Sequence, residues 1–143
     1  MRSLCSRREY CSSDILKKSL TLLDGNQETA NDVLAALIKD KYVDDLRYAT
    51  AYARDKSVIS GWGVVKIRHA LALKSIPRDI VSAALEEIDG DRAQVRLEKL
   101  MEAKARSLRN DPHARLKLIR YALGRGYGYD EVSTLVDMLL NAD

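Results

Sequence analysis

The feature that most restricts the fold of this chain is a pattern of residues that returns along the sequence. Lys74-Ser75-Ile76 aligns with Arg125-Gly126-Tyr127 at a shift of 51 residues, since 127 minus 76 is 51. The same shift places Ile67, Asp79, Val81 and Ile88 on Leu118, Asp130, Val132 and Leu139. Because the aligned stretches carry apolar residues at helical spacing, the repeat predicts tandem helical units, each of which needs a neighbour to complete its core.

Helical spacing accounts for nearly the whole chain, and no segment alternates apolar and polar residues for long enough to predict a strand. We therefore expect an all-α protein, built of tandem three-helix, helix-turn-helix-like repeats stacked into an elongated, curved body. The expected units are a partial first repeat at residues 1–43, a central repeat at 44–90 and a C-terminal repeat at 91–143. The first helix pair is expected to imitate the later pairs with a longer connection, from Leu20 to Asn26.

Capping residues indicate where the helices begin, because a short polar side chain accepts hydrogen bonds from the free amides of a first turn. The candidate caps are Ser12 or Ser13, Asn26 or Thr29, Asp44 or Asp45, and Asn110-Asp111-Pro112, with Pro77 in the first turn of another helix. Residues 1–11 form either a short helical turn or a frayed arm. The residues expected to face inward include Ile15, Leu37, Ile38, Leu46, Ala49, Val64, Ile67, Leu71, Ala83, Ala84, Leu97, Met101, Leu116, Leu118, Leu123, Val132 and Val136.

Composition narrows the class of protein. Phenylalanine is absent, so cohesion is expected from aliphatic rows, and 24 basic minus 21 acidic residues leave a net charge of only +3. This charge is too small for strong non-specific binding to nucleic acid, so an electrostatic role depends on where the charges lie. Cys5 and Cys11 are expected to be reduced thiols. With no signal-peptide pattern, and with its longest apolar run at 33–38, the chain is expected to be a soluble cytoplasmic protein.

Signatures of enzymes are missing from the sequence. It has no glycine-rich phosphate loop, no Gly-x-Ser-x-Gly elbow and no His-Glu-x-x-His pair, and its two histidines, His69 and His113, stand apart. Asp44 and Asp45 are adjacent, so their side chains would diverge at a helix start, which favours capping over acid–base catalysis. We therefore predict no catalytic residue, no metal ligand and no cofactor.

Basic side chains at turn spacing are the best candidates for binding a partner, because they could follow phosphates or an acidic protein surface. One set shares a face of an expected helix and comprises Arg92, Arg96, Lys99 and Arg106. Glu102 could instead pair with Lys99 and Arg106 and leave a self-neutralising, solvated face. The remaining candidates are Lys117 and Arg120 on the next helix, and Arg47 and Arg54, two turns apart on an earlier one.

Four aromatic residues at helix starts and turns admit two interpretations. Tyr48, Trp62, Tyr127 and Tyr129 could stack on the bases of single-stranded nucleic acid, or they could cover a small core. The sequence alone leaves both open.

Several modest motifs, in this order and spacing, resemble one known family. The acidic pair before Arg47-Tyr48-Ala49, the Gly61-Trp62-Gly63 segment and the Lys74-Ser75-Ile76-Pro77 turn are similar to the middle unit of RecX, the bacterial regulator of the RecA recombinase. The stretch from Arg7 to Lys18 is similar to that family's N-terminal segment. The family's usual Lys-Gly turn is Lys74-Ser75 in this chain.

The resemblance implies a function. A protein of this family is a non-enzymatic modulator that lies along the groove of the RecA filament on single-stranded DNA, or caps its growing end. There it interferes with strand exchange, ATP turnover and filament extension. A monomer is expected, with weak DNA contact at most and no membrane contact. The alternatives are a small helix-turn-helix protein that binds duplex DNA directly, and a helical scaffold for another protein.

Overall fold

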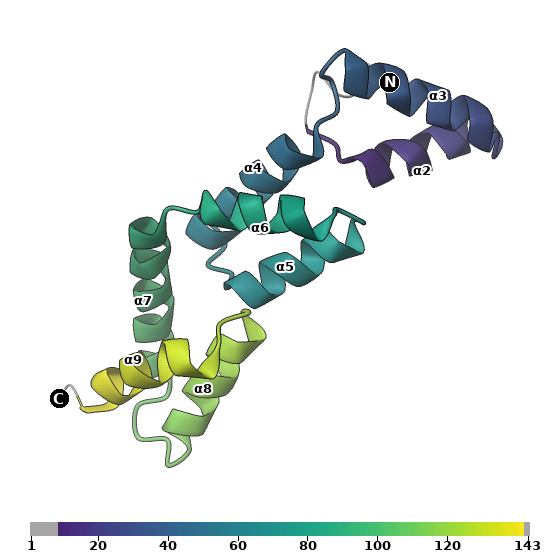
Figure 1. Ribbon diagram of the computed structural model, residues 1–143. Coiled ribbons are helices and arrows are strands. Elements are labelled where there is room, and N and C mark those ends of the chain that lie inside the picture. The colour runs from purple at the N-terminus through teal and green to yellow at the C-terminus, as the bar shows by residue number, and fades with distance from the viewer. Residues whose placement is uncertain (1–8, 142–143) are drawn as a thin grey trace. The chain divides into compact units, whose positions relative to one another are not determined.

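The computed structural model describes residues 9–141, and every regular element in that range is an α-helix (Figure 1). The helices are α2 (Ser12–Leu22), α3 (Gln27–Lys39), α4 (Asp45–Val58), α5 (Val64–Leu73), α6 (Arg78–Glu86), α7 (Gly90–Ser107), α8 (Ala114–Gly124) and α9 (Tyr129–Asn141). The all-α prediction is confirmed. No helix of this described stretch has the length and apolar character that crossing a bilayer would require. Most of residues 1–11, for which a turn or an arm was expected, lie outside the described range.

The described residues fall into two compact units. The first runs to Tyr52 and adds Leu71–Glu86, and the second joins Ala53–Ala70 with the residues from Glu87 onward. The division passes through α4 and α5. In the first unit α2 packs against α3, and in the second α7, α8 and α9 all pack against one another.

The internal repeat is visible as one turn geometry used three times. The connections at 23–26, 74–77 and 125–128 separate α2 from α3, α5 from α6 and α8 from α9. Each has a residue with positive φ at the same place, namely Asp24 (φ 53), Ser75 (φ 59) and Gly126 (φ 96), and the first connection has a second one at Gly25 (φ 83). A backbone hydrogen bond closes each turn, and its donor amide lies five residues after its acceptor carbonyl. The pairs are Gly25 and Leu20 at 2.8 Å, Ile76 and Leu71 at 3.3 Å, and Tyr127 and Ala122 at 3.1 Å. These are Schellman-type helix ends at a constant shift of 51 residues. The expectation of a longer first connection was wrong, because α2 continues through Leu20 to Leu22.

Helix caps follow the sequence in part. Asn26 caps α3 as predicted, accepting from the Thr29 amide at 3.1 Å. Asp44 caps α4, accepting from the Arg47 amide at 3.0 Å. The prediction of Ser12 or Ser13 as a cap was wrong, because α2 begins after Cys11, which makes no side-chain cap. The Ser12 amide donates instead to Asp45 Oδ1 at 2.8 Å. The second carboxylate of the acidic pair therefore accepts a hydrogen bond from the first residue of α2, 33 residues earlier in the chain.

Two other helix starts lie slightly later than expected. Pro77 stands just before α6, and its carbonyl accepts from Val81, so it precedes the first turn. Asp111 accepts from the His113 amide at 2.8 Å, which closes a turn before α8 and does not cap the helix itself.

The core of the second unit lies between α7, α8 and α9. It contains Leu97, Met101, Leu118, Ile119, Ala122, Tyr127, Val132 and Val136. Leu116 and Leu123 were expected to be inward, but their side chains are 49% and 45% exposed. The inward face of α8 is centred on Leu118, Ile119 and Ala122. Since α7 and α9 both pack against α8, these two neighbours decide which arc of its apolar residues is buried.

The first unit has a smaller core, which gathers Tyr10, Ile15, Leu37 and Val43. Ile38 and Leu46 were expected to be inward and are exposed, as are Ala83 on α6 and Val64 in the second unit. Other members of the same predicted rows are buried as expected, namely Leu37, Ala49, Ile67, Leu71 and Ala84, and Tyr48 and Val81 are buried beside them. Helical spacing fixes a wide arc, and packing chooses which of its residues are buried.

Candidate partner-binding surfaces

The predicted basic set on α7 is only partly brought together. Arg92, Arg96 and Lys99 line one hollow of about 350 Å³, together with Val58, Asp91 and Val95. We call this the α7 hollow. Positions 92, 96 and 99 are four and three residues apart, so the three side chains leave the helix on one face. Asp89 fixes the start of that helix by accepting from the Arg92 amide at 3.1 Å.

The cations of the α7 hollow form no ion pair among the described residues, although Asp91 lines the same hollow. In the same part of the chain, Glu102 forms an ion pair with neither Lys99 nor Arg106, so the pairing expected for a self-neutralising face is not seen. Glu98 instead accepts from Gln94 Nε2 at 3.3 Å. Arg96 is half-buried, and its Nε is buried without a hydrogen-bond acceptor in the described part of the chain. A buried donor that has lost its water and gained no acceptor is costly, so Arg96 is held in the hollow with one of its donors unsatisfied.

Arg106 lies apart from these three residues. It lines a second, more polar hollow of about 620 Å³ with Glu102, Arg109 and Asp111 among its neighbours. Lys117 bonds Asp111 Oδ2 at 2.6 Å across the same region. The hydrogen bond from Lys117 lowers the pKa of Asp111, and the His113 amide adds to the effect. Arg120 is exposed on α8.

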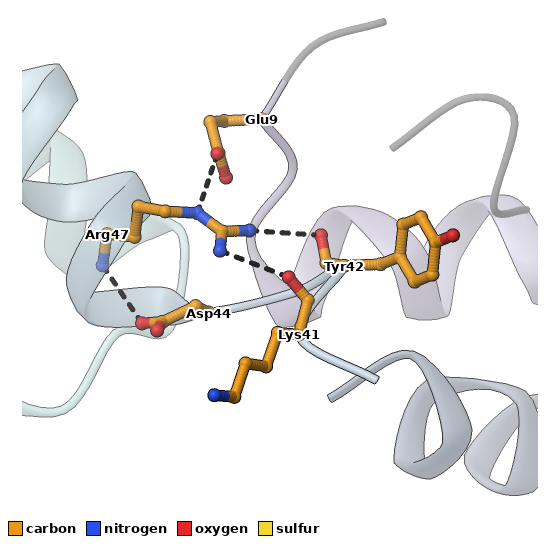
Figure 2. A network of polar contacts seen from close by, with 5 residues as sticks. All are labelled: Glu9, Lys41, Tyr42, Asp44 and Arg47. Atoms are coloured by element: carbon orange, nitrogen blue, oxygen red, sulfur yellow. Dashed lines mark hydrogen bonds and ion pairs between the residues drawn. The ribbon is translucent and has the colours of Figure 1, made fainter. Parts of the chain in front are cut away.

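Arg47 holds a turn together, as Figure 2 shows. Its Nε donates to Glu9 Oε1 at 2.7 Å, and its two terminal nitrogens donate to the carbonyls of Lys41 and Tyr42 at 3.0 and 3.3 Å. These carbonyls belong to the bend between α3 and α4, where Lys41 has a positive φ of 62. Arg54, on the same helix, forms an ion pair with its neighbour Asp55 at 3.7 Å and with no other residue of the described range. A partner-binding role for either arginine stays a prediction.

The aromatic residues divide between the two interpretations. Tyr48 and Tyr127 are buried, so neither ring offers a face to a nucleic-acid base, and the stacking interpretation is wrong for both. Tyr48 stacks on Tyr52 with ring centroids 6.0 Å apart. Trp62 lines a small hollow of about 160 Å³ with Leu97 and Tyr127, and Lys56 and Lys66 lie over its ring at 4.6 and 4.4 Å. Tyr129 is exposed.

A clamp around the Gly61-Trp62-Gly63 segment was not foreseen. Arg125 donates from its guanidinium to the carbonyls of Ser60 and Gly61, and the Tyr127 hydroxyl donates to the Gly61 carbonyl at 3.0 Å. The Gly63 and Val65 amides donate to the carbonyls of Arg125 and Gly126 at 2.7 and 3.0 Å. In the sequence, Trp62 and Tyr127 are each flanked by two glycines. This pattern alone does not reveal that the two segments are in contact.

A second unforeseen contact lies in the first unit. Lys74 bonds Asp14 at 2.7 Å, with the aspartate largely buried. No group of three His, Cys, Asp or Glu side chains within 9–141 is arranged to hold a metal ion.

Comparison with known proteins identifies the family. The model of the second three-helix domain of RecX matches residues 44–85. The chain is 28% identical to the regulatory protein RecX of Clostridium botulinum (strain Eklund 17B / Type B) over 130 residues, which cover 88% of this chain and 60% of that protein. It is 31% identical to the regulatory protein RecX of Pectobacterium atrosepticum over 136 residues, which cover 90% of this chain and 83% of that one. The chain belongs to the RecX family.

The fold of this RecX-family chain agrees with a solved relative. A crystal structure of regulatory protein RecX superposes with a TM-score of 0.81 at 25% identity, covering 97% of this chain and 67% of the other. The family's helical-repeat architecture is therefore confirmed. The chain spans about 60% of the length of the Clostridium botulinum relative. These relatives are named regulatory proteins, which describes a control function and not a catalysed reaction.

One departure from the family's turn has a visible consequence. Ser75 stands at the position expected to be glycine in a RecX protein, and it adopts φ 59 there. A side chain in this left-handed region crowds the following carbonyl, so the RecX-family chain carries local strain at a turn that glycine would relieve.

Proposed function

We propose that this chain binds the RecA filament on single-stranded DNA and modulates, mainly inhibits, its ATP turnover, strand exchange and extension. Membership of the RecX family supports the identity of the partner. The observation that carries the proposal at the level of residues is the α7 hollow, in which three cations gather and form no ion pair among the described residues. A filament of protein and DNA is rich in carboxylates and phosphates, so such a surface is suited to it.

The proposed mode of action is occupation of a surface, without chemistry. The chain would act in the cytoplasm as a monomer and without a cofactor, by holding a filament in a state that neither extends nor turns over. Arg106, Lys117 and Arg120 would extend the contact beyond the α7 hollow. Arg47 and Arg54 remain candidates, although the guanidinium of Arg47 is already occupied by Glu9 and two carbonyls.

The low net charge of +3 favours a local contact over a general attraction to DNA. If the contact is made by a few fixed cations, reversing them should abolish binding. Reversing the same number of charges elsewhere should not. This comparison separates a specific surface from the bulk electrostatic attraction that any basic protein has for a nucleoprotein.

The experiment is co-sedimentation with RecA filaments assembled on single-stranded DNA. In one variant Arg92, Arg96, Lys99 and Arg106 are all changed to Glu. The matched control changes Lys17, Lys39, Arg68 and Arg78 to Glu, which are exposed and form no ion pair in the described residues. We expect the first variant to stay in the supernatant and the control to sediment as the wild type does. Circular dichroism of both variants checks that they are folded.

A second arm distinguishes the filament from bare DNA. Co-purification from cell extract is repeated with and without nuclease, and RecA and DNA are followed separately. RecA-dependent retention supports the proposal. Retention by duplex DNA in the absence of RecA would replace it with the direct DNA-binding alternative, and equal sedimentation of both charge variants would move the contact away from α7.

A further inference from the structure

We propose that the α7 hollow takes a carboxylate side chain of a partner protein together with a neighbouring aliphatic side chain, so that it contacts acidic protein surface and not the phosphates of nucleic acid. This inference rests on the proposed function, because it names which chemical part of the filament the hollow meets. It goes beyond that function by assigning the ligand class of one site.

The donors of the hollow are arranged for a single anionic group. Arg92 and Lys99 are exposed at its rim, whereas Arg96 is half-buried and has a buried Nε without an acceptor in the described residues. A guanidinium presents its donors as a planar fork that matches the two oxygens of a carboxylate. A carboxylate in the hollow would therefore meet the guanidinium charge of Arg96, while the two outer cations, Arg92 and Lys99, add further positive charge around it.

The apolar wall requires a ligand with an aliphatic part. Val58 and Val95 line the same hollow, and the Val95 side chain is 50% exposed. Ile59, next to Val58 in the chain, is also exposed. A sugar–phosphate backbone would leave these groups in contact with water or polar oxygens. An aliphatic side chain beside the carboxylate would bury them, which contributes to binding in proportion to the area removed from water.

The acidic residues around the hollow disfavour a long polyanion. Asp91 lines it, and Glu98 and Glu102 lie on the next turns of α7. Phosphates that continue on both sides of the bound group would meet all three of these carboxylates, whereas a single Glu or Asp side chain would meet Asp91 alone among them, and three cations line the same hollow. The volume of about 350 Å³ lies near the lower end of small-ligand sites, which suits two side chains.

The test is an NMR titration of the full chain, which follows the Arg96 Nε–H and the Val95 methyl resonances. The probes are an acetylated, amidated Ala-Glu-Leu-Ala peptide, its Ala-Gln-Leu-Ala analogue, inorganic phosphate and a thymidine oligonucleotide, all at matched ionic strength. We expect the Glu peptide to move both sets of resonances saturably. The Gln peptide should bind at least about tenfold more weakly, since a charge-assisted hydrogen bond is lost. Phosphate or the oligonucleotide moving both sets as strongly as the Glu peptide would overturn the inference.

Variants locate the site. Arg96→Met and, separately, Lys99→Met should weaken the Glu peptide about tenfold or more, and Val95→Ala should weaken it by a few-fold. The matched control is Arg68→Met, an exposed cation on α5 that lies outside the hollow, and it should leave the titration unchanged. An Arg68→Met variant that weakens the peptide as much as Lys99→Met does would contradict the assignment.

The two proposals fail in different ways. If the Glu peptide moves no resonance while the wild type still sediments with RecA filaments, the ligand assignment is wrong and the proposed function stands. If the peptide binds at Arg96 while the chain leaves RecA filaments unbound, the hollow is an acidic-peptide site and its partner is another protein.

Discussion

Gly63 and Gly126 approach each other so closely that neither position has room for a side chain. A Cβ at Gly63 would lie 2.3 Å from the Gly126 carbonyl oxygen, and a Cβ at Gly126 would lie 2.3 Å from Lys66 Cβ. The contact lets the amides of Gly63 and Val65, at the start of α5, donate to the turn between α8 and α9. In the second unit, therefore, backbone hydrogen bonds join these two segments at glycines that are distant in sequence.

Gly126→Ala should destabilise the protein by about 2–4 kcal/mol, because α5 must move away from the turn and the residue at 126 has φ 96. The control is Gly124→Ala, where a Cβ would meet nothing within 4 Å. That variant should change stability by less than about 1 kcal/mol, in the stabilising direction. Urea unfolding of the two variants measures the difference, and equal stabilities would show that the close approach is not rigid.

Ser75→Gly should stabilise the protein by about 0.5–1 kcal/mol. The residue is exposed and adopts φ 59, so glycine removes left-handed strain and loses no buried contact. Part of the gain is offset by the greater freedom of glycine in the unfolded chain. The midpoint of urea unfolding gives the sign, and a lower midpoint than that of the wild type would rule out strain at this turn.

The pair of Asp14 and Lys74 should make stability depend on pH. Burial raises the pKa of Asp14, but hydrogen bonds from Lys74 and Cys11 outweigh it and leave that pKa below its ordinary value. The hydrogen bond to Asp14 raises the pKa of Lys74. A carboxyl whose pKa is lowered by folding contributes stability above its unfolded pKa, and this contribution is lost as pH falls through the folded value.

Lys74→Met should therefore cost about 1 kcal/mol near neutral pH, and the cost should shrink below about pH 4 as Asp14 is protonated in the wild type. The contribution should also fade as pH rises above the ordinary pKa of lysine, and it is lost once pH passes the raised pKa at which the folded Lys74 ammonium gives up its proton. Unfolding experiments at several pH values measure the difference in the free energy of unfolding between Lys74→Met and the wild type. A difference that stays constant from neutral to acidic pH would contradict an ionic interaction.

Arg47→Met should loosen the bend between α3 and α4, because two backbone carbonyls and Glu9 lose their donor. We expect a loss of about 1–2 kcal/mol and faster hydrogen exchange at the amides around residue 42. Arg54→Met is the control on the same helix, since Arg54 forms an ion pair with Asp55 and with no other residue of the described range. It should cost less than about 0.5 kcal/mol. Similar exchange in both variants would mean that the Arg47 contacts do not hold the bend.

Local features of the fold could be predicted from the sequence, and long-range ones could not. Asn26 and Asp44 act as caps because the cap and the amide it serves lie within three residues. Asp45 looks the same in the sequence, yet it serves Ser12 at a separation of 33 residues. Likewise, periodicity identified α8 as amphipathic, but only its packing against α7 and α9 determines that Leu118 is buried and Leu116 is exposed.

The candidate site shows the same division. The spacing of Arg92, Arg96 and Lys99 along one helix was enough to predict a shared basic face. The contribution of Val58, which comes from α4, required the tertiary structure. The orphaned Nε of Arg96 also depends on what surrounds it, so no pattern of residue types could have indicated it.

The central claim is tested most directly by the rate of RecA-dependent ATP hydrolysis on single-stranded DNA as the purified chain is added. The account predicts that hydrolysis slows at fewer than one chain per RecA protomer, because a chain bound to a filament affects protomers beyond those it touches. It also predicts that the variant with Arg92, Arg96, Lys99 and Arg106 changed to Glu has lost this effect while remaining folded. A rate that stays unchanged across the whole titration would contradict the proposed function.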